Sequence, residues 1–124
     1  MTKESFVQAL QKREDGEISI TVKGRRSGRA ITLPVWFVLE GTTLWLLPVK
    51  GGRTQWYQNL LADPTITIRT GRQRQTFQAR AVNDPETVGA VVTQFRKKYT
   101  PGEIARYYTG LDVAVEVALE PGAE

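Results

Sequence analysis

The chain of 124 residues contains no cysteine and no histidine. Without cysteine it has no disulfide, no thiolate metal ligand and no cysteine nucleophile, which is typical of a protein in a reducing cytoplasm. Histidine is the residue on which most zinc sites and most proton shuttles near neutral pH depend. We therefore predict no metal site and no catalytic side chain, and we expect an enzyme built from this chain to use a cofactor.

Long apolar runs are also absent. The longest, LPVWFVL at residues 33–39, is too short to span a bilayer. The first residues, MTKESFVQALQKRED, lack the apolar segment of a secretory signal, so we expect neither a membrane span nor a signal peptide. The length suits one hydrophobic core, and we predict a single domain over residues 1–124, located in the cytoplasm.

Acidic residues are scarce in two parts of the chain, whose net charge is +4. Between Glu17 and Asp63 the only acid is Glu40. Cations fill that span and a second acid-free span after it: Lys23, Arg25, Arg26, Arg29, Lys50, Arg53, then Arg69, Arg72, Arg74 and Arg80. This distribution predicts a positive surface that attracts an anion, such as a phosphorylated cofactor, an acidic metabolite or a nucleic acid.

Hydrophobic periodicity predicts six strands, mostly antiparallel, at residues 17–23, 31–39, 43–47, 65–69, 73–82 and 111–119. Helices are predicted at residues 3–13, 54–61, 84–99 and 100–108, with Thr54, Asp84 and Thr100 as N-caps. The N-terminal helical region ends by residue 15, and residues 120–124 are expected to fray. The predicted class is mainly β with helices (α+β), and such short strands tend to close into a barrel.

Residues 31–39 are apolar at nearly every position, which predicts a strand covered on both faces. Pro34 within this run cannot donate to a strand ladder, so it marks an edge strand or a bulge.

Two motifs are suited to an anion. In VKGGRTQW, residues 49–56, Lys50 and Gly51 precede the start of a predicted helix, where free N–H groups and glycines favour a phosphate. In GRRSGR, residues 24–29, Ser27 adds a hydroxyl to crowded arginines that an anion would stabilise. Read from composition alone, a flexible turn and a solvated basic hairpin are equally good explanations of these two motifs.

Aromatic residues offer candidates for a ring-binding site. Trp36 and Trp56 could stack on a planar group, whereas Trp45 lies in a strongly apolar strand and is predicted to be core. Tyr107 and Tyr108 could donate a proton or line a pocket, and Tyr99, at helical spacing, is predicted to be core.

The ordered motifs G-R-R-S-G-R, L-P-V-W-F-V, L-L-P-V-K-G-G and W-Y-Q-N-L-L-A-D-P together resemble the deazaflavin-dependent nitroreductase family, over roughly residues 18–119. The resemblance implies a six-stranded split β-barrel of the FMN-binding type. It also implies a reductase that binds the deazaflavin coenzyme F420 and transfers hydride to a quinone, a nitroaromatic or a similar conjugated acceptor. The expected partners are thus an anionic phosphorylated cofactor and a small-molecule substrate.

By the same resemblance, Arg26, Ser27 and Lys50 reach the cofactor phosphate, and Gly51 contributes backbone. Trp36 and Trp56 lie near the ring system. Asn59 is expected to pin its helix rather than to touch the ligand.

The sequence departs from the family pattern at Ile31, where some members carry arginine, and at Val49, where a serine is common. Related split barrels bind FMN, haem or fatty acids, so an FMN-, haem- or lipid-binding protein without F420 turnover is the alternative. A basic nucleic-acid-binding barrel is a weaker third reading. Split barrels of this type often pair, which favours a homodimer.

Overall fold

The computed structural model describes residues 3–12 and 17–119. Its helices are α1 (Lys3–Lys12), α2 (Gln55–Ala62), α3 (Pro85–Tyr99) and α4 (Pro101–Tyr107), with a 3-10 turn η1 (Gly51–Arg53) before α2. Its strands are β1 (Ile18–Lys23), β2 (Ala30–Val35), β3 (Val38–Glu40), β4 (Thr43–Leu46), β5 (Thr65–Thr70), β6 (Gln73–Val82) and β7 (Ala114–Ala118). The expected helix end at residues 15–16 and the expected fraying of residues 120–124 lie outside the described residues.

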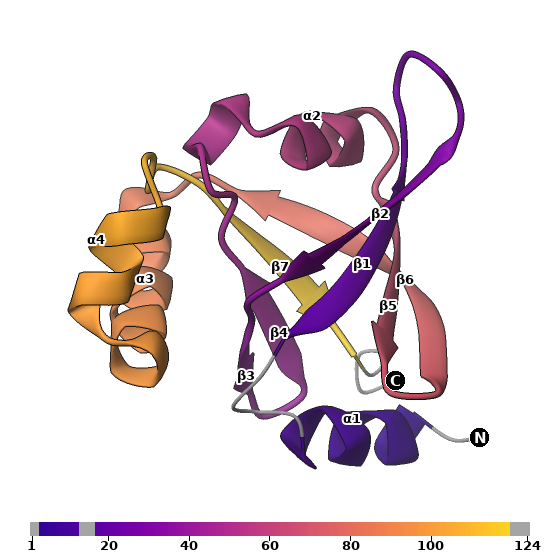
Figure 1. Cartoon of the computed structure of the whole chain (residues 1–124), viewed down its shortest axis with the longest axis horizontal. Helices are drawn as coiled ribbons and strands as arrows, with labels where there is room; N and C mark the ends of the chain where they lie inside the picture. The colour runs from indigo at the N-terminus through magenta and orange to yellow at the C-terminus, as the bar shows by residue number, and fades with distance from the viewer. Residues whose placement is uncertain (1–2, 13–16, 120–124) are drawn as a thin grey trace.

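The strands form one sheet in the order β2-β1-β5-β6-β7-β4-β3, and all neighbours are antiparallel. The long strand β6 pairs with β5 along residues 73–78 and with β7 along residues 79–82. It therefore belongs to both halves of a sheet that curls into a half-barrel (Figure 1). The predicted α+β class and the antiparallel barrel architecture are confirmed.

The strand count differs from the prediction because residues 31–39 do not form one strand. The chain leaves β2 at Trp36 and Phe37 and starts β3 at the opposite edge of the sheet. The N–H and C=O of Phe37 instead bond to the Tyr99 hydroxyl, at 3.2 and 3.0 Å. Those two bonds satisfy the backbone polar groups where the sheet is interrupted.

The expectation that both faces of this run are covered is wrong for β2. As an edge strand, β2 has only exposed or half-buried side chains, and Ile31 remains 40% exposed. Pro34 lies in this outermost strand, so its predicted edge position is confirmed.

Two apolar clusters cover the two faces of the sheet. The first fills the half-barrel, and α1 adds Phe6 and Leu10 to it from below in Figure 1. The second lies between α3, α4 and strands β3, β4 and β7, and contains Trp45 and Tyr99, both predicted to be core. Burial of each large apolar side chain contributes about 1.5–3 kcal/mol, so these clusters fix α4 and the segment around Trp36 relative to the sheet.

The predicted helix starts are found at the expected residues. The Asp84 carboxylate accepts the N–H of Thr87 at 2.9 Å, and the Thr100 hydroxyl accepts the N–H of Glu103 at 3.2 Å. Thr54 occupies the N-cap position of α2, but its hydroxyl accepts the N–H of Lys50 at 2.8 Å instead of a helix N–H. None of the helices in the described ranges has the length and apolarity needed to cross a membrane.

Candidate functional site

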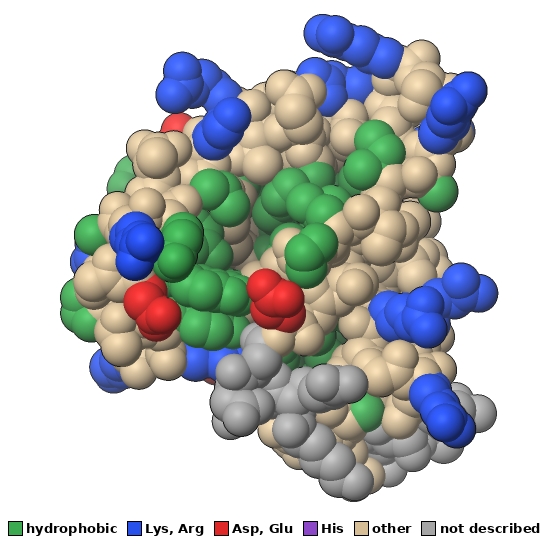
Figure 2. All heavy atoms as spheres, viewed as in Figure 1, with side chains coloured by type: hydrophobic (Ala, Val, Ile, Leu, Met, Phe, Trp, Pro, Cys, Tyr) green, Lys and Arg blue, Asp and Glu red, His purple; other side chains and the backbone are tan. Residues whose placement is uncertain are grey.

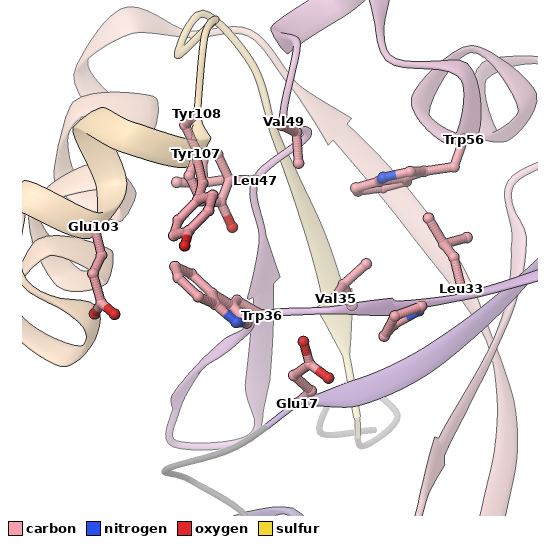
Figure 3. A pocket seen from close by; sticks show the side chains of 11 residues that line it. Glu17, Leu33, Val35, Trp36, Leu47, Val49, Trp56, Glu103, Tyr107 and Tyr108 are labelled. Carbon is pink, nitrogen blue, oxygen red and sulfur yellow. The ribbon is translucent and has the colours of Figure 1, made fainter.

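A pocket of about 420 Å³ opens between β2, α2 and α4. Figure 2 shows it as an apolar hollow on the face of the molecule, and Figure 3 shows its walls from close by. Its volume is in the range of small-molecule sites, about 300–1,000 Å³. The residues that line it are Glu17, Leu33, Pro34, Val35, Trp36, Leu47, Val49, Trp56, Glu103, Tyr107 and Tyr108.

One wall is built on Trp36. Its ring stacks on Tyr99, with centroids 4.3 Å apart and planes 7° apart, and Tyr107 meets it edge-on at 5.6 Å. Tyr99 is itself held by its two hydrogen bonds to Phe37. The stack therefore fixes the orientation of Trp36 before any ligand binds.

The facing wall is formed by Trp56, with Leu33 and Val35 from β2 (Figure 3). Trp56 belongs to the first turn of α2 and is buried. The structure thus brings the two predicted ring neighbours, Trp36 and Trp56, to one pocket. Flat apolar walls of this kind suit a planar conjugated ring.

Arg25 fixes α2 against the β1–β2 hairpin. Its backbone N–H and its Nη1 both donate to the buried Asn59 Oδ1, at 3.1 and 2.7 Å, and its Nη2 donates to Gln55 Oε1 at 3.0 Å. Asn59 therefore pins the helix, as predicted, and holds Trp56 in place.

The Lys50-Gly51 turn lies beside Val49 at the rim of the pocket. Lys50 is exposed, and within the described part of the chain its ammonium forms no ion pair. Backbone N–H groups here already have partners in the chain: Gly51 donates to the Pro48 carbonyl at 3.0 Å and Gly52 to Asp112 Oδ1 at 3.1 Å. In this turn the lysine side chain is free to meet an anion, whereas the Gly51 and Gly52 N–H groups are engaged.

Arg26 and Ser27 lie at the tip of the β1–β2 hairpin, which projects past α2 in Figure 1. Ser27 Oγ accepts the N–H of Arg29 at 3.1 Å, and Arg26 is exposed. Neither residue lines the pocket. The structure therefore places these two predicted phosphate ligands outside the pocket that holds Trp36 and Trp56.

Two acidic residues of the pocket were not identified as site residues from the sequence. Glu17 precedes β1, and its sequence context indicates only a solvated charge. Glu103 lies in the first turn of α4, and its context indicates only a helix start. Both roles are local, and only the fold brings the start of β1 and the first turn of α4 to one hollow. No sequence signal could have paired them.

Tyr107 and Tyr108 line the pocket, one of the two roles anticipated for them. Burial, with a smaller contribution from Tyr99, raises the pKa of the Tyr108 hydroxyl well above its usual value. This hydroxyl therefore stays protonated at physiological pH and can only donate or accept as a neutral group. Tyr107 is 48% exposed and reaches both the pocket and solvent.

Solved structures with the same fold include two reductases and a haem protein. An F420-H2 dependent reductase named FDR-A is 24% identical, covering 82% of this chain and 92% of its own, with a TM-score of 0.63. A second F420 reductase is 19% identical, covering 82% and 84%, with a TM-score of 0.56. HutZ, a haem storage protein from Vibrio cholerae, is 19% identical over 96% and 90%, with a TM-score of 0.66.

The sequence itself matches the model of one family, described as F420H(2)-dependent quinone reductase, over residues 2–120. The aromatic walls fit the ring of such a cofactor, and the exposed Lys50 beside the pocket fits its anionic part. The chain therefore belongs to the F420H(2)-dependent quinone reductase family and is an F420-dependent reductase.

Proposed function

We propose that this reductase transfers hydride to a quinone, a nitroaromatic or a similar conjugated acceptor bound between Trp36 and Trp56. The observation that supports the proposal is the single hollow in which these two tryptophans face each other across about 420 Å³. F420 supplies the hydride when it is bound. The chain itself binds the cofactor and the acceptor, orients them and excludes water from the pocket.

Lys50 is proposed to hold the cofactor phosphate with its free ammonium, assisted by Arg26 and Ser27 from the hairpin. Gly51 contributes by shaping the turn that presents Lys50. A charge-assisted contact of this kind is about twice as strong as a neutral hydrogen bond. Because Arg26 and Ser27 lie outside the pocket, we assign them to the part of the cofactor that extends beyond it.

Trp36 and Trp56 are proposed to orient the ring and the acceptor face to face. Orientation of two reactants converts an encounter into an intramolecular step, and this is the main contribution proposed for the chain. The apolar walls exclude water from the reacting atoms. Tyr107, at the boundary between pocket and solvent, or water itself supplies the proton that completes the reduction.

We also propose that the protein forms a homodimer and that it is located in the cytoplasm. A protein solved as a domain-swapped dimer shares the fold, at 23% identity over 93% of this chain and 95% of its own, with a TM-score of 0.65. Sedimentation of the purified protein measures the assembly directly.

The test is a titration of the protein with F420 and FMN side by side, followed by hydride transfer from reduced F420 to a quinone. We expect binding of F420, weaker binding of FMN and turnover of the quinone. Tighter binding of FMN, or a flavin or haem spectrum of the purified protein, would favour the alternative without F420 turnover.

The Lys50→Ala variant tests the proposed phosphate contact. Loss of one charge-assisted bond is worth about 1.5–3 kcal/mol, so F420 affinity should fall about tenfold or more while the thermal midpoint stays the same. Lys97→Ala, an exposed lysine on α3 outside the pocket, is the matched control. Equal F420 affinity of the Lys50 variant and the control would rule out the contact.

A further inference from the structure

The charges in and beside the pocket are separated by sign. Of its lining residues, all within the described part of the chain, only Glu17 and Glu103 carry a charge, and both are acids. In Figure 2 acidic side chains border the apolar hollow, and in Figure 3 Glu17 points toward Val35 and Trp36. The exposed Lys50 follows Val49, on the opposite side of the pocket in Figure 3.

In the described part of the chain, neither the Glu17 nor the Glu103 carboxylate forms a hydrogen bond or an ion pair that would stabilise the fold. Within residues 3–12 and 17–119 the recorded ion pair joins Arg80 to Glu116, and no hydrogen bond to either carboxylate is found. Glu103 is tied to the cap of α4 through its backbone N–H and not through its side chain. Both charges are exposed and are thus available to a ligand that enters the pocket.

The nearby cations are directed elsewhere. Lys98 Nζ donates to the Phe37 carbonyl at 2.7 Å and lies 3.7 Å from the Phe37 ring centroid. Arg106 lies over the Tyr107 ring, with its Cζ 5.4 Å from the centroid. Neither cation lines the pocket, so the charged side chains of its lining are the two carboxylates.

We propose that Glu17 and Glu103 determine acceptor specificity by charge, favouring neutral and cationic acceptors over anionic ones. The inference rests on the proposed function, because it concerns the acceptor of the same pocket. In the proposed function the anionic cofactor is held by Lys50, which leaves the acidic side of the pocket to the acceptor. A carboxylate about 7 Å from an acceptor's negative charge, in water, disfavours that acceptor about threefold.

The test uses two quinones of similar shape, 1,4-naphthoquinone and its 2-sulfonate. Their dissociation constants are measured by quenching of tryptophan fluorescence in the protein with oxidised F420 bound, and their kcat/KM values with reduced F420. We expect the neutral quinone to bind more tightly. In the Glu17→Gln/Glu103→Gln variant, measured at saturating F420, the affinity for the neutral quinone relative to the sulfonate should fall about five- to tenfold. The difference between the two proteins should shrink at 0.5 M salt.

Glu86→Gln is the matched control, since Glu86 is also an exposed acid in a first helical turn but does not line this pocket. It should leave the ratio as in the unaltered protein. An equal affinity ratio in the double variant and the control, or no binding of either quinone, would overturn the inference. Binding that follows charge without quinone turnover would leave the inference standing and refute the proposed function.

Discussion

Gly51 lies where two segments distant in sequence meet. Its φ is +63°, and a Cβ there would collide with a carboxylate oxygen of Asp112 and lie 3.3 Å from the carbonyl carbon of Gly110. The glycines of this motif were interpreted as a place for a phosphate to approach the backbone. The structure gives Gly51 another physical role, since it lets the Asp112 side chain reach the Gly52 N–H.

Gly51→Ala should lower the free energy of unfolding by more than Gly41→Ala does. Gly41 has nearly the same φ, +62°, but no heavy atom within 4 Å of a built Cβ. The control therefore measures backbone strain alone, about 1–2 kcal/mol, and the excess at Gly51 measures the collision. Chemical denaturation gives both values, and Asp112→Ala should remove most of the excess when combined with Gly51→Ala. Equal losses at the two glycines would refute this account.

At the residue scale, the position of a side chain could be predicted where a motif carries it, while its role toward a cofactor stays a prediction. Trp36 and Trp56 were assigned through the family resemblance, and the fold brings them to one pocket. Glu17 and Glu103 were not identified as pocket residues, because they are more than 80 positions apart in the chain and meet only in the fold. Their local patterns, a strand start and a helix start, are satisfied without any reference to a pocket.

At the level of elements, local chemistry predicted the helices well because caps and proline positions act over three or four residues. The division of residues 31–39 into β2 and β3 could not be predicted in the same way. The partner that replaces strand pairing there is the hydroxyl of Tyr99, 62 positions beyond Phe37. The hydrophobic pattern of residues 31–39 does not show that a distant side chain takes the place of a neighbouring strand.

The turns that bound α2 and α3 should make stability depend on acidic pH. Asp63 ends α2 and Asp84 caps the start of α3. Hydrogen bonds from Thr65 lower the pKa of Asp63, and hydrogen bonds from Thr87 lower the pKa of Asp84. A lowered pKa means that the folded state prefers the carboxylate, so this stabilisation is complete above about pH 4. It is lost as the pH falls through the folded-state pKa values.

The Asp63→Asn/Asp84→Asn variant should therefore show a thermal midpoint that falls less steeply than that of the unaltered protein between pH 4 and 2. Glu86→Gln, an acid with no hydrogen-bonded role in a cap, is the control. Parallel curves for all three proteins would show that these caps do not couple to protonation.

For the whole molecule, the positive charges fall into separate groups on the surface. The β1–β2 hairpin carries Arg26 and Arg29 near α2. Arg72 in the β5–β6 turn and Arg74 at the start of β6 lie at the other end of the sheet (Figure 1). Composition alone predicted a general attraction for anions. The proposed function assigns the anionic part of the cofactor to the first group, because this group lies on the hairpin beside α2.

F420 affinity should accordingly decrease with increasing salt, because Lys50, Arg26 and Arg29 are exposed and salt screens their charges. Arg26→Ala/Arg29→Ala should weaken F420 binding and flatten this salt dependence, whereas Arg72→Ala/Arg74→Ala should change neither. Titrations at 0.05, 0.15 and 0.5 M salt distinguish the two pairs. Equal effects of both pairs would mean that net charge, and not the hairpin, attracts the cofactor.

The segment between α4 and β7 is attached to the turn that carries Lys50. Thr109 and Gly110 donate to the Val49 carbonyl at 2.8 and 3.3 Å, and Asp112 accepts from Gly52. The same segment begins with Tyr108 and directly follows Tyr107, and both tyrosines line the pocket. A ligand bound at Lys50 and a ligand bound beside Tyr107 and Tyr108 therefore both depend on this hydrogen-bonded support segment. By thermodynamic linkage, a cofactor that stiffens this support must alter the affinity for the acceptor, and the acceptor must alter the affinity for the cofactor by the same factor.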